Sequence, residues 1–327
     1  MLEYFPQEIL LEIFLKLPIN SIVQCTSICK SWNAIIRNPT FISTHLNQAI
    51  SSTKDSLFLL KTGQFFSFIG SCNGLICLAD YHYAASNTFI LRNPPICKFM
   101  TLPKPNVTFE THDKCIPETP RTECDIRNPW QLPSFVGFGF DSHTNDYKVL
   151  RIAEFNNNEM PMIEVYSLIA GSWKFLPTTR QKYNIVQKCK QAFVNGVVHF
   201  IAFQEDEHGD TEKMYVPGFD FSDEFFCEFM LLEESYSPIQ CSLWAMKKYG
   251  DLESWTKLFA KQGEAVPRAL GLRKSGELLL DFYRSSTKGI VSYDAEKQQR
   301  KSINIHNKRG DHFLCTYVES LALLDKP

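Results

Sequence analysis

The sequence predicts an α+β multidomain chain: a small helical domain at residues 1–46, a linker at 47–63 and an all-β domain at 64–325. Three observations support this prediction. Apolar residues recur at helical spacing near the N-terminus. After about residue 55 the apolar runs become short and are separated by Gly, Pro, Asn and Asp. In this second part, one kind of turn-and-strand segment recurs.

The first helix is expected to begin at Pro6 and to end at Pro18. Proline suits a first helical position because the N–H group that it lacks would have no partner there, and it disfavours helix in the residue before it. The apolar residues between the prolines lie in one stripe on a helix; they are Ile9, Leu10, Ile13, Phe14 and Leu17.

Three further helical segments are expected before residue 50. Asn20 or Ser21 is a candidate cap for a second helix. Ser31 is a candidate cap for a third, which Asn38-Pro39 would end. Residues 41–46 resemble one or two more helical turns.

Short segments rich in aromatic and β-branched residues are expected to form strands. These segments are 65–69, 74–79, 88–91, 136–140, 148–152, 163–168, 197–203, 215–221, 226–232, 242–247, 277–282 and 290–293. Because no long amphipathic helix is expected among them, the second part is predicted to be mostly β.

Weak repeats favour a β-propeller for the second part. A tight-turn pair directly precedes an apolar strand at Asn73-Gly74, Asn195-Gly196 and Ser275-Gly276. The spacings between these glycines are close to multiples of about 40 residues, the size of a propeller blade. A β-sandwich is the alternative.

The composition excludes several classes of partner. The formal charge is -2, from 34 Lys plus Arg and 36 Asp plus Glu, so neither nucleic acid nor a polybasic contact with a membrane is expected. No apolar run reaches the length of a membrane span, about 18 residues, and no signal peptide is expected. The 11 Cys are odd in number and several lie in apolar runs. This pattern is typical of reduced cysteines and predicts the cytoplasm, the nucleus or both.

No motif predicts an enzyme, a cofactor or a metal site. Cys72 lies at the centre of residues 70–74, which mimic a nucleophile elbow, but a strand follows where an elbow needs a helix. A tight turn is the favoured interpretation. His112, Cys115 and Cys124 match no standard zinc-ligand spacing, so a solvated loop is favoured for them.

The helical domain carries more apolar residues than it can bury. A helical unit of this size lies near the lower limit for independent folding. Three short helices cannot enclose all of the large apolar side chains between Ile9 and Ile36. Either the β domain covers the remainder, as a helical cap on its own core, or a partner protein does.

The N-terminal sequence resembles an F-box. Residues 5–18 read FPQEILLEIFLKLP, residues 21–25 SIVQC, residues 29–36 CKSWNAII and residues 38–41 NPTF. In that family these helices bind a Skp-type adaptor, which joins a cullin ubiquitin ligase. The resemblance implies a set of adaptor-binding residues, some in the interface and some in the F-box core: Pro6, Ile9, Leu10, Ile13, Leu17, Pro18, Ile22, Val23 and Trp32.

The second part resembles the F-box-associated domain of plant F-box proteins, which implies a kelch-like β-propeller. The resemblance rests on GSCNGLIC at 70–77, LRNP at 91–94, GFGFD at 137–141, NDYKV at 145–149 and FVNG at 193–196. S-locus F-box proteins, which recognise pollen–pistil ribonucleases, share this layout with many paralogues. Relatives usually place another turn-and-strand unit at the position of residues 233–242, so an incomplete or short blade is expected here.

The resemblance implies a substrate-receptor subunit of a ubiquitin ligase, with an unknown protein as its substrate. Residues 103–133 are the longest stretch without a strand pattern. Long loops in compact domains are commonly functional or disordered, and Arg121, Arg127 and Trp130 are the candidate substrate-binding residues. A passive insert is the competing interpretation of this stretch. The competing function is a β-propeller interaction protein outside any ligase, with a helical N-terminal cap.

Overall fold

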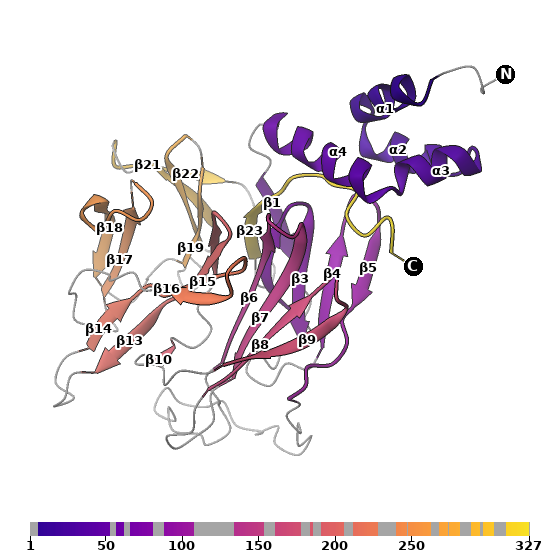
Figure 1. Cartoon of the computed structure of the whole chain (residues 1–327). Coiled ribbons are helices and arrows are strands. Elements are labelled where there is room, and N and C mark those ends of the chain that lie inside the picture. The colour runs from indigo at the N-terminus through magenta and orange to yellow at the C-terminus, as the bar shows by residue number, and fades with distance from the viewer. Residues whose placement is uncertain are drawn as a thin grey trace, which may run out of the picture.

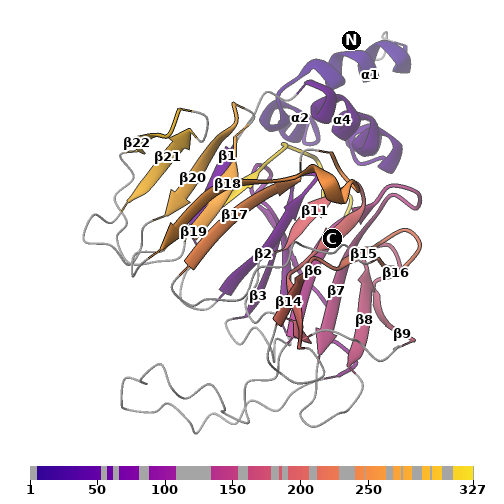
Figure 2. The same cartoon turned by 90° about the vertical axis from the view of Figure 1, so that its left-hand side faces the viewer.

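The computed structural model describes residues 6–52, 57–61, 66–80, 88–107, 134–153, 161–177, 184–185, 191–205, 212–227, 240–246, 248–262, 268–273, 275–281, 289–294, 297–303 and 312–326. The helices are α1 (Gln7–Lys16), α2 (Ile19–Cys25), α3 (Lys30–Ile36) and α4 (Pro39–Ser52). They lie together at one end of the β domain (Figures 1 and 2).

Helix α1 begins one residue later than the sequence predicts, and the other three helices begin slightly earlier. Pro6 is the N-cap of α1 and not its first residue. The caps predicted at residues 20–21 and at Ser31 are wrong, because Pro18 precedes α2 and Cys29 precedes α3 as N-caps. Pro18 and Cys29 have the extended backbone that an N-cap requires, although neither side chain makes a capping hydrogen bond.

Helix α4 is much longer than the one or two turns expected at 41–46. It begins with Pro39 and continues to Ser52. Its many polar residues conceal the helical pattern in the sequence. Several of their hydroxyl groups donate hydrogen bonds to backbone carbonyls inside the helix; Ser43 donates to Thr40 and Ser51 to Asn47. Helix α4 and strand β1 therefore form regular structure within the residues 47–63 expected as a linker.

The β domain consists of antiparallel sheets. Among the described residues, four sheets have four strands each, and we call them blades. The first blade consists of β2 (Phe66–Cys72), β3 (Leu75–Asp80), β4 (Phe89–Asn93) and β5 (Lys98–Thr101), and the second of β6 (Ser134–Asp141), β7 (Asp146–Ala153), β8 (Met162–Ser167) and β9 (Ser172–Leu176). The third blade consists of β11 (Ala192–Val194), β12 (Val197–His199), β15 (Gly218–Asp220) and β16 (Phe225–Cys227), and the last of β19 (Arg268–Leu272), β20 (Glu277–Asp281), β21 (Ile290–Asp294) and β22 (Gln299–Ile303).

The other sheets among the described residues are smaller. They are β10 (Asn184–Ile185), β13 (Ala202–Glu205) and β14 (Glu212–Tyr215); β17 (Gln240–Met246) and β18 (Trp255–Gln262), joined by the short helix η1 (Leu252–Ser254); and β1 (Leu57–Lys61) with β23 (His312–Thr316). Strand β23 also contacts β2 of the first blade and β19 of the last. In the described part, β17 and β18 form a pair where the blades have four strands, consistent with the short blade expected there.

The repeated turns mark corresponding hairpins in three blades. They join β2 to β3, β11 to β12 and β19 to β20, in each case the first two strands of a four-stranded sheet. Asn73-Gly74 and Asn195-Gly196 have positive φ at both residues, which a hairpin turn of type I′ requires. Together with the separate four-stranded antiparallel sheets, the repeat of this hairpin confirms the propeller-like class in preference to a sandwich.

The strands that the sequence pattern misses include the last strands of three blades, β5, β9 and β22. Strand β5 alternates between half-buried and exposed residues, and β22 is exposed at all but its last residue. These edge strands carry too little apolar pattern to be recognised, because they have a neighbour on only one side.

The C-terminal tail, residues 317–326, is fixed to the first blade. The side chain of Asn93, at the end of β4, donates hydrogen bonds to the carbonyl oxygens of Ser320 (2.9 Å) and Ala322 (2.8 Å). Lys98 on β5 donates to the carbonyl oxygen of Lys326 at 2.5 Å. Because Asn93 is completely buried, these bonds satisfy groups that no solvent reaches.

The same tail completes the core of the helical domain. Leu321 (0% exposed) and Leu324 (3%) belong to one buried cluster with residues of all four described helices. The helical members are Phe14, Ile19, Ile22, Ile36 and Phe41. Figure 1 shows the tail in yellow between the helices and the first blade. The two domains are therefore joined through a shared core.

A buried group of charges joins the second and third blades. The ammonium group of Lys148 on β7 lies 3.0 Å from the carboxylate of Asp141 and 3.3 Å from that of Glu224. It also donates to the carbonyl oxygen of Phe221 at 2.7 Å. Burial raises the pKa of Asp141, but hydrogen bonds from Thr144, Lys148 and other neighbours outweigh it and hold that pKa well below its ordinary value.

Replacing Leu321 by Ala is expected to lower the free energy of unfolding of the helical domain by about 2–5 kcal/mol, because it leaves a cavity in the shared core. Hydrogen exchange of the α1–α4 amides measures this effect. Val318→Ala, in the same tail but outside the cluster, is the matched control. Equal protection of the helices in both variants would contradict a shared core.

Replacing Asp141 by Asn is expected to lower the free energy of unfolding at pH 7 by about 3 kcal/mol, because it breaks a buried ion pair. Since the folded pKa of Asp141 is depressed, its contribution is present above about pH 4, the pKa of an unfolded aspartate, and is lost as the pH falls below it. Urea unfolding between pH 7 and pH 3 should show a shallower acid loss in Asp141→Asn than in the wild type, whereas exposed Asp223→Asn should match the wild type.

Candidate functional site

The nine predicted adaptor-binding residues form two groups that differ in burial. Five belong to the helical core: Ile22 is completely buried, and the others pack against the cluster as half-buried residues, namely Leu10, Leu17, Val23 and Trp32. The ring of Trp32 meets that of Phe14 edge to face at 5.0 Å between centroids. These five side chains therefore support the helices from inside.

The remaining residues of the motif are exposed. Ile9 is 45% and Ile13 43% exposed, and Pro6 and Pro18 are exposed beyond the ends of α1. Because residues four apart on a helix are neighbours on one side, Ile9 and Ile13 form a continuous apolar strip. We call these two residues the helical apolar face.

A further exposed apolar residue was not among the predicted contacts. Ile28, between α2 and α3, is 56% exposed. In the sequence, Ile28 continues the helical spacing of the apolar residues Ile22, Val23 and Cys25 and is thus expected in the second helix, but α2 ends at Cys25. An earlier helix end would have been needed to recognise it as a surface residue.

Of the two alternatives for covering the apolar helices, the structure shows cover by the β domain, and only on one side. The tail residues Leu321 and Leu324 cover the inner side, so the β domain supplies part of the missing core. The helical apolar face stays uncovered by the described part of the chain. Adjacent large aliphatic groups on a surface are typical of a protein interface.

The structure supports the interpretation of Cys72 as part of a hairpin. Its side chain is buried at the end of β2, and Asn73 and Gly74 form the turn to β3. Burial raises the pKa of the Cys72 thiol to about 12. The thiol therefore stays protonated at neutral pH and is a poor nucleophile.

His199, which lies in the apolar run at residues 197–201, is a core histidine. It is buried on β12, and its Nε2 lies 3.0 Å from the hydroxyl oxygen of Tyr249. Burial lowers the pKa of His199 and favours its neutral form. In the part of the chain that the structure describes, no three or more His, Cys, Asp or Glu side chains are grouped to hold a metal ion. His112, Cys115 and Cys124 lie outside that part.

The candidate substrate-binding residues Arg121, Arg127 and Trp130 also lie outside the described residues. The structure does describe Val107, the last described residue before them in the chain. A buried ion pair between Arg151 on β7 and Glu164 on β8 (2.9 Å) holds both backbone groups of Val107. Arg151 donates to the Val107 carbonyl oxygen at 2.7 Å, and the Val107 N–H donates to Glu164 at 3.2 Å.

This anchor lies toward the end of the second blade that is remote from the helices. The opposite end of β7 begins at Asp146, which lines a pocket together with residues of α4. Arg151 lies five residues further along β7.

None of the helices in the described residues is long and apolar enough to cross a membrane.

Several plant proteins are similar to this chain along most of its length. The F-box protein At3g07870 of Arabidopsis thaliana is 25% identical and covers 100% of this chain and 93% of its own length. The F-box protein CPR1 of the same plant is 23% identical and covers 97% of this chain and 88% of its own length. The F-box/kelch-repeat protein At3g23880 is 21% identical, with 85% of each chain covered.

Solved structures resemble the chain only distantly. TolB from Acinetobacter baumannii aligns over 79% of this chain and 56% of its own, with a TM-score of 0.41 and 10% identity. A puromycin hydrolase aligns over 79% of this chain and 40% of its own, with a TM-score of 0.42 and 10% identity.

Two family patterns match the sequence, and together they span both domains. The pattern described as F-box-like matches residues 2–48, which include α1 to α3 and most of α4. The pattern described as F-box associated beta propeller domain matches residues 27–324. The chain thus belongs to the family of F-box proteins with an F-box-associated β-propeller domain.

Proposed function

We propose that the protein is the substrate-receptor subunit of a Skp–cullin–F-box ubiquitin ligase. The observation that carries this proposal is the exposure of Ile9 and Ile13 beside a buried core built from the other apolar residues of the same motif. A helix that only capped the β domain would have no need for two large aliphatic side chains on its outer side.

In this role the chain supplies proximity and not bond chemistry. The ubiquitin-conjugating enzyme of the assembly carries the reactive thioester. The receptor raises the effective concentration of substrate lysines near that thioester. This division of labour requires a receptor with two binding surfaces in a fixed relation. With this role, the proposed location of the protein is that of the ligase, namely the cytoplasm, the nucleus or both.

The adaptor would bind the exposed residues directly. Pro6, Ile9, Ile13 and Pro18 are the proposed contacts, since their side chains are accessible. The core residues act by holding α1 in place; these are Leu10, Leu17, Ile22, Val23 and Trp32. Substitution of a core residue would thus weaken adaptor binding by loosening the helices.

The β domain would bind the substrate. Arg121, Arg127 and Trp130 remain the proposed contacts, and the anchor at Val107 supports a position remote from the helices. Such a position keeps the substrate clear of the adaptor. Ribonucleases of pollen–pistil recognition are one candidate substrate, by resemblance to S-locus F-box proteins.

The second candidate function is an interaction protein outside any ligase. The contacts of Leu321 and Leu324 with the helices favour it in part, because they show that the helices do cap the β domain on one side. The two candidates differ in what they predict for the outer side of α1.

Replacing both Ile9 and Ile13 by Asp is expected to weaken binding to a purified plant Skp-type adaptor at least about thirtyfold, because two central apolar contacts of an interface are lost. Isothermal titration calorimetry measures the dissociation constant. The melting temperature should stay within a few degrees of the wild type, since both side chains are exposed.

The matched control is Asn47→Asp with Gln48→Asp, which adds the same charge at two exposed positions of α4. The control should bind like the wild type. Failure of the wild type to bind, or equal affinity of both double variants, would favour the interaction protein outside a ligase.

Replacing Arg121 and Arg127 by Glu and Trp130 by Ala is expected to remove substrates while leaving adaptor binding intact. Affinity purification with the proteasome blocked, compared by quantitative mass spectrometry, measures the loss. Proteins bound equally by the triple variant and the wild type would contradict these contacts. Reduced adaptor recovery would instead indicate misfolding.

A further inference from the structure

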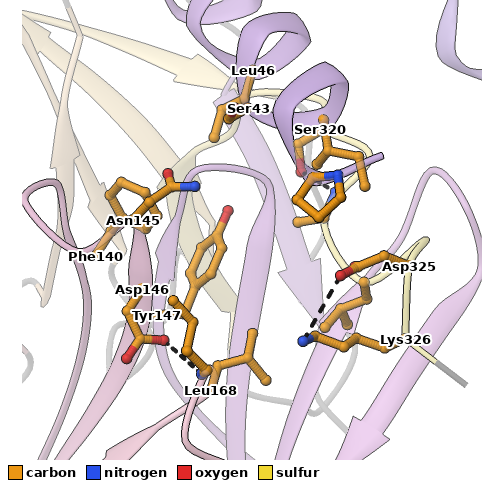
Figure 3. A pocket seen from close by; sticks show the side chains of 15 residues that line it. Ser43, Leu46, Phe140, Asn145, Asp146, Tyr147, Leu168, Ser320, Asp325 and Lys326 are labelled. Carbon is orange, nitrogen blue, oxygen red and sulfur yellow. Dashed lines mark hydrogen bonds and ion pairs between the residues drawn. The ribbon is translucent and has the colours of Figure 1, made fainter. Parts of the chain in front are cut away.

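A pocket of about 290 Å³ lies where the helical domain, the second blade and the C-terminal tail meet. Figure 3 shows α4 on one side, the start of β7 on another and the tail opposite. The apolar part of its lining comes from all three: Ile42, Leu46, Phe140, Tyr147, Leu168 and Leu323. Ligand sites are common at such junctions between domains.

Two aromatic rings form a fixed wall of this pocket. Phe140 and Tyr147 meet edge to face, with 4.9 Å between their centroids. The Tyr147 hydroxyl donates to the carbonyl oxygen of Asn73 at 2.8 Å, which holds the ring in place. Because aromatic faces carry negative charge density, such a wall accepts both apolar groups and cations.

The charged side chains that line the pocket have a negative excess, while the Lys98 ammonium, which is not among them, donates to the backbone carbonyl oxygen of Lys326. Asp146 and Asp325 line it together with one cation, Lys326. The Asp146 carboxylate accepts hydrogen bonds from the Ser167 hydroxyl and the Ile169 N–H. Asp325 and Lys326 are only loosely paired, at 3.8 Å, and both are partly exposed. An incoming cation could therefore replace Lys326 beside Asp325.

The size and charge of the pocket together define its ligand. A volume of about 290 Å³ suits a small molecule and is too small for a helix, which is about 10 Å across. We propose that the pocket binds a small amine with an apolar body, with its ring or alkyl part between α4 and the Phe140 and Tyr147 rings and its ammonium group beside Asp325.

Binding of such an amine would stabilise the junction. The pocket walls belong to α4, to the end of the second blade where β6 meets β7 and β8 meets β9, and to the tail. A ligand that contacts all three is released when the domains separate, so it favours the joined state. The proposal concerns a site apart from the helical apolar face and does not depend on adaptor binding.

Saturation-transfer NMR with 2-phenylethylamine as the probe tests the charge preference. Two compounds of similar size are its controls, neutral 2-phenylethanol and anionic 3-phenylpropionate. At pH 7 the amine should bind most tightly and the anion least. The absence of amine binding at millimolar concentrations, or tighter binding of the anion, would overturn the proposal.

A matched pair of variants locates the binding. Ser43 and Ser51 both lie on α4 and both donate to a backbone carbonyl within the helix, but only Ser43 lines the pocket. Ser43→Trp should fill the pocket and abolish amine binding, whereas Ser51→Trp should bind like the wild type. Equal amine binding by both variants would place the amine elsewhere and overturn the proposal.

The contribution of the carboxylate is tested separately. Asp325→Asn should weaken amine binding about two- to fivefold, the range of an exposed ion pair, and should reduce the preference for the amine over 2-phenylethanol. Asp223→Asn, exposed on the turn before β16, should change neither. An unchanged preference in Asp325→Asn would overturn the assigned position of the ammonium group.

Discussion

The insertion of Leu321 and Leu324 into the helical cluster is the interaction on which the rest of the structure depends. A helical unit of this size cannot enclose a core by itself. The last residues of the β domain supply what it lacks, and the side chain of Asn93 fixes them to the first blade by two hydrogen bonds. The beginning and the end of the chain therefore share one core, and the helical domain depends on the tail of the β domain to complete it.

This shared core decides which helical residues remain available to a partner. The tail occupies the inner side of the helices and leaves Ile9 and Ile13 of α1 exposed on the outer side. It also fixes this surface relative to the second blade, where Arg151 and Glu164 hold the chain that leads to the candidate substrate contacts. A receptor that works by proximity needs such a fixed relation, because a freely moving joint would dilute the effective concentration of substrate.

Local patterns predicted much of the fold, and long-range contacts account for the rest. The stripe of α1 and the Asn-Gly turns were recognisable because spacing and turn chemistry act within a few residues. The separation of exposed Ile9 from half-buried Leu10 was not, since both belong to the same stripe and only the packing of the helices and the tail distinguishes them. The role of Leu321 depends on residues some three hundred positions away, and exposed edge strands such as β22 carry no apolar pattern. The pocket had no sequence signal either, because its walls come from three separate parts of the chain.

Native-state hydrogen exchange of the unmodified protein tests the shared core most directly. The amides of α1 to α4 and those of the first blade are compared for the free energy of the opening that exposes them. A shared core predicts that the most protected helical amides open with the same free energy, and the same denaturant dependence, as the most protected amides of β3 and β4. Helical amides that open at much lower free energy, while the first blade stays closed, would contradict the joining of the two domains through the tail.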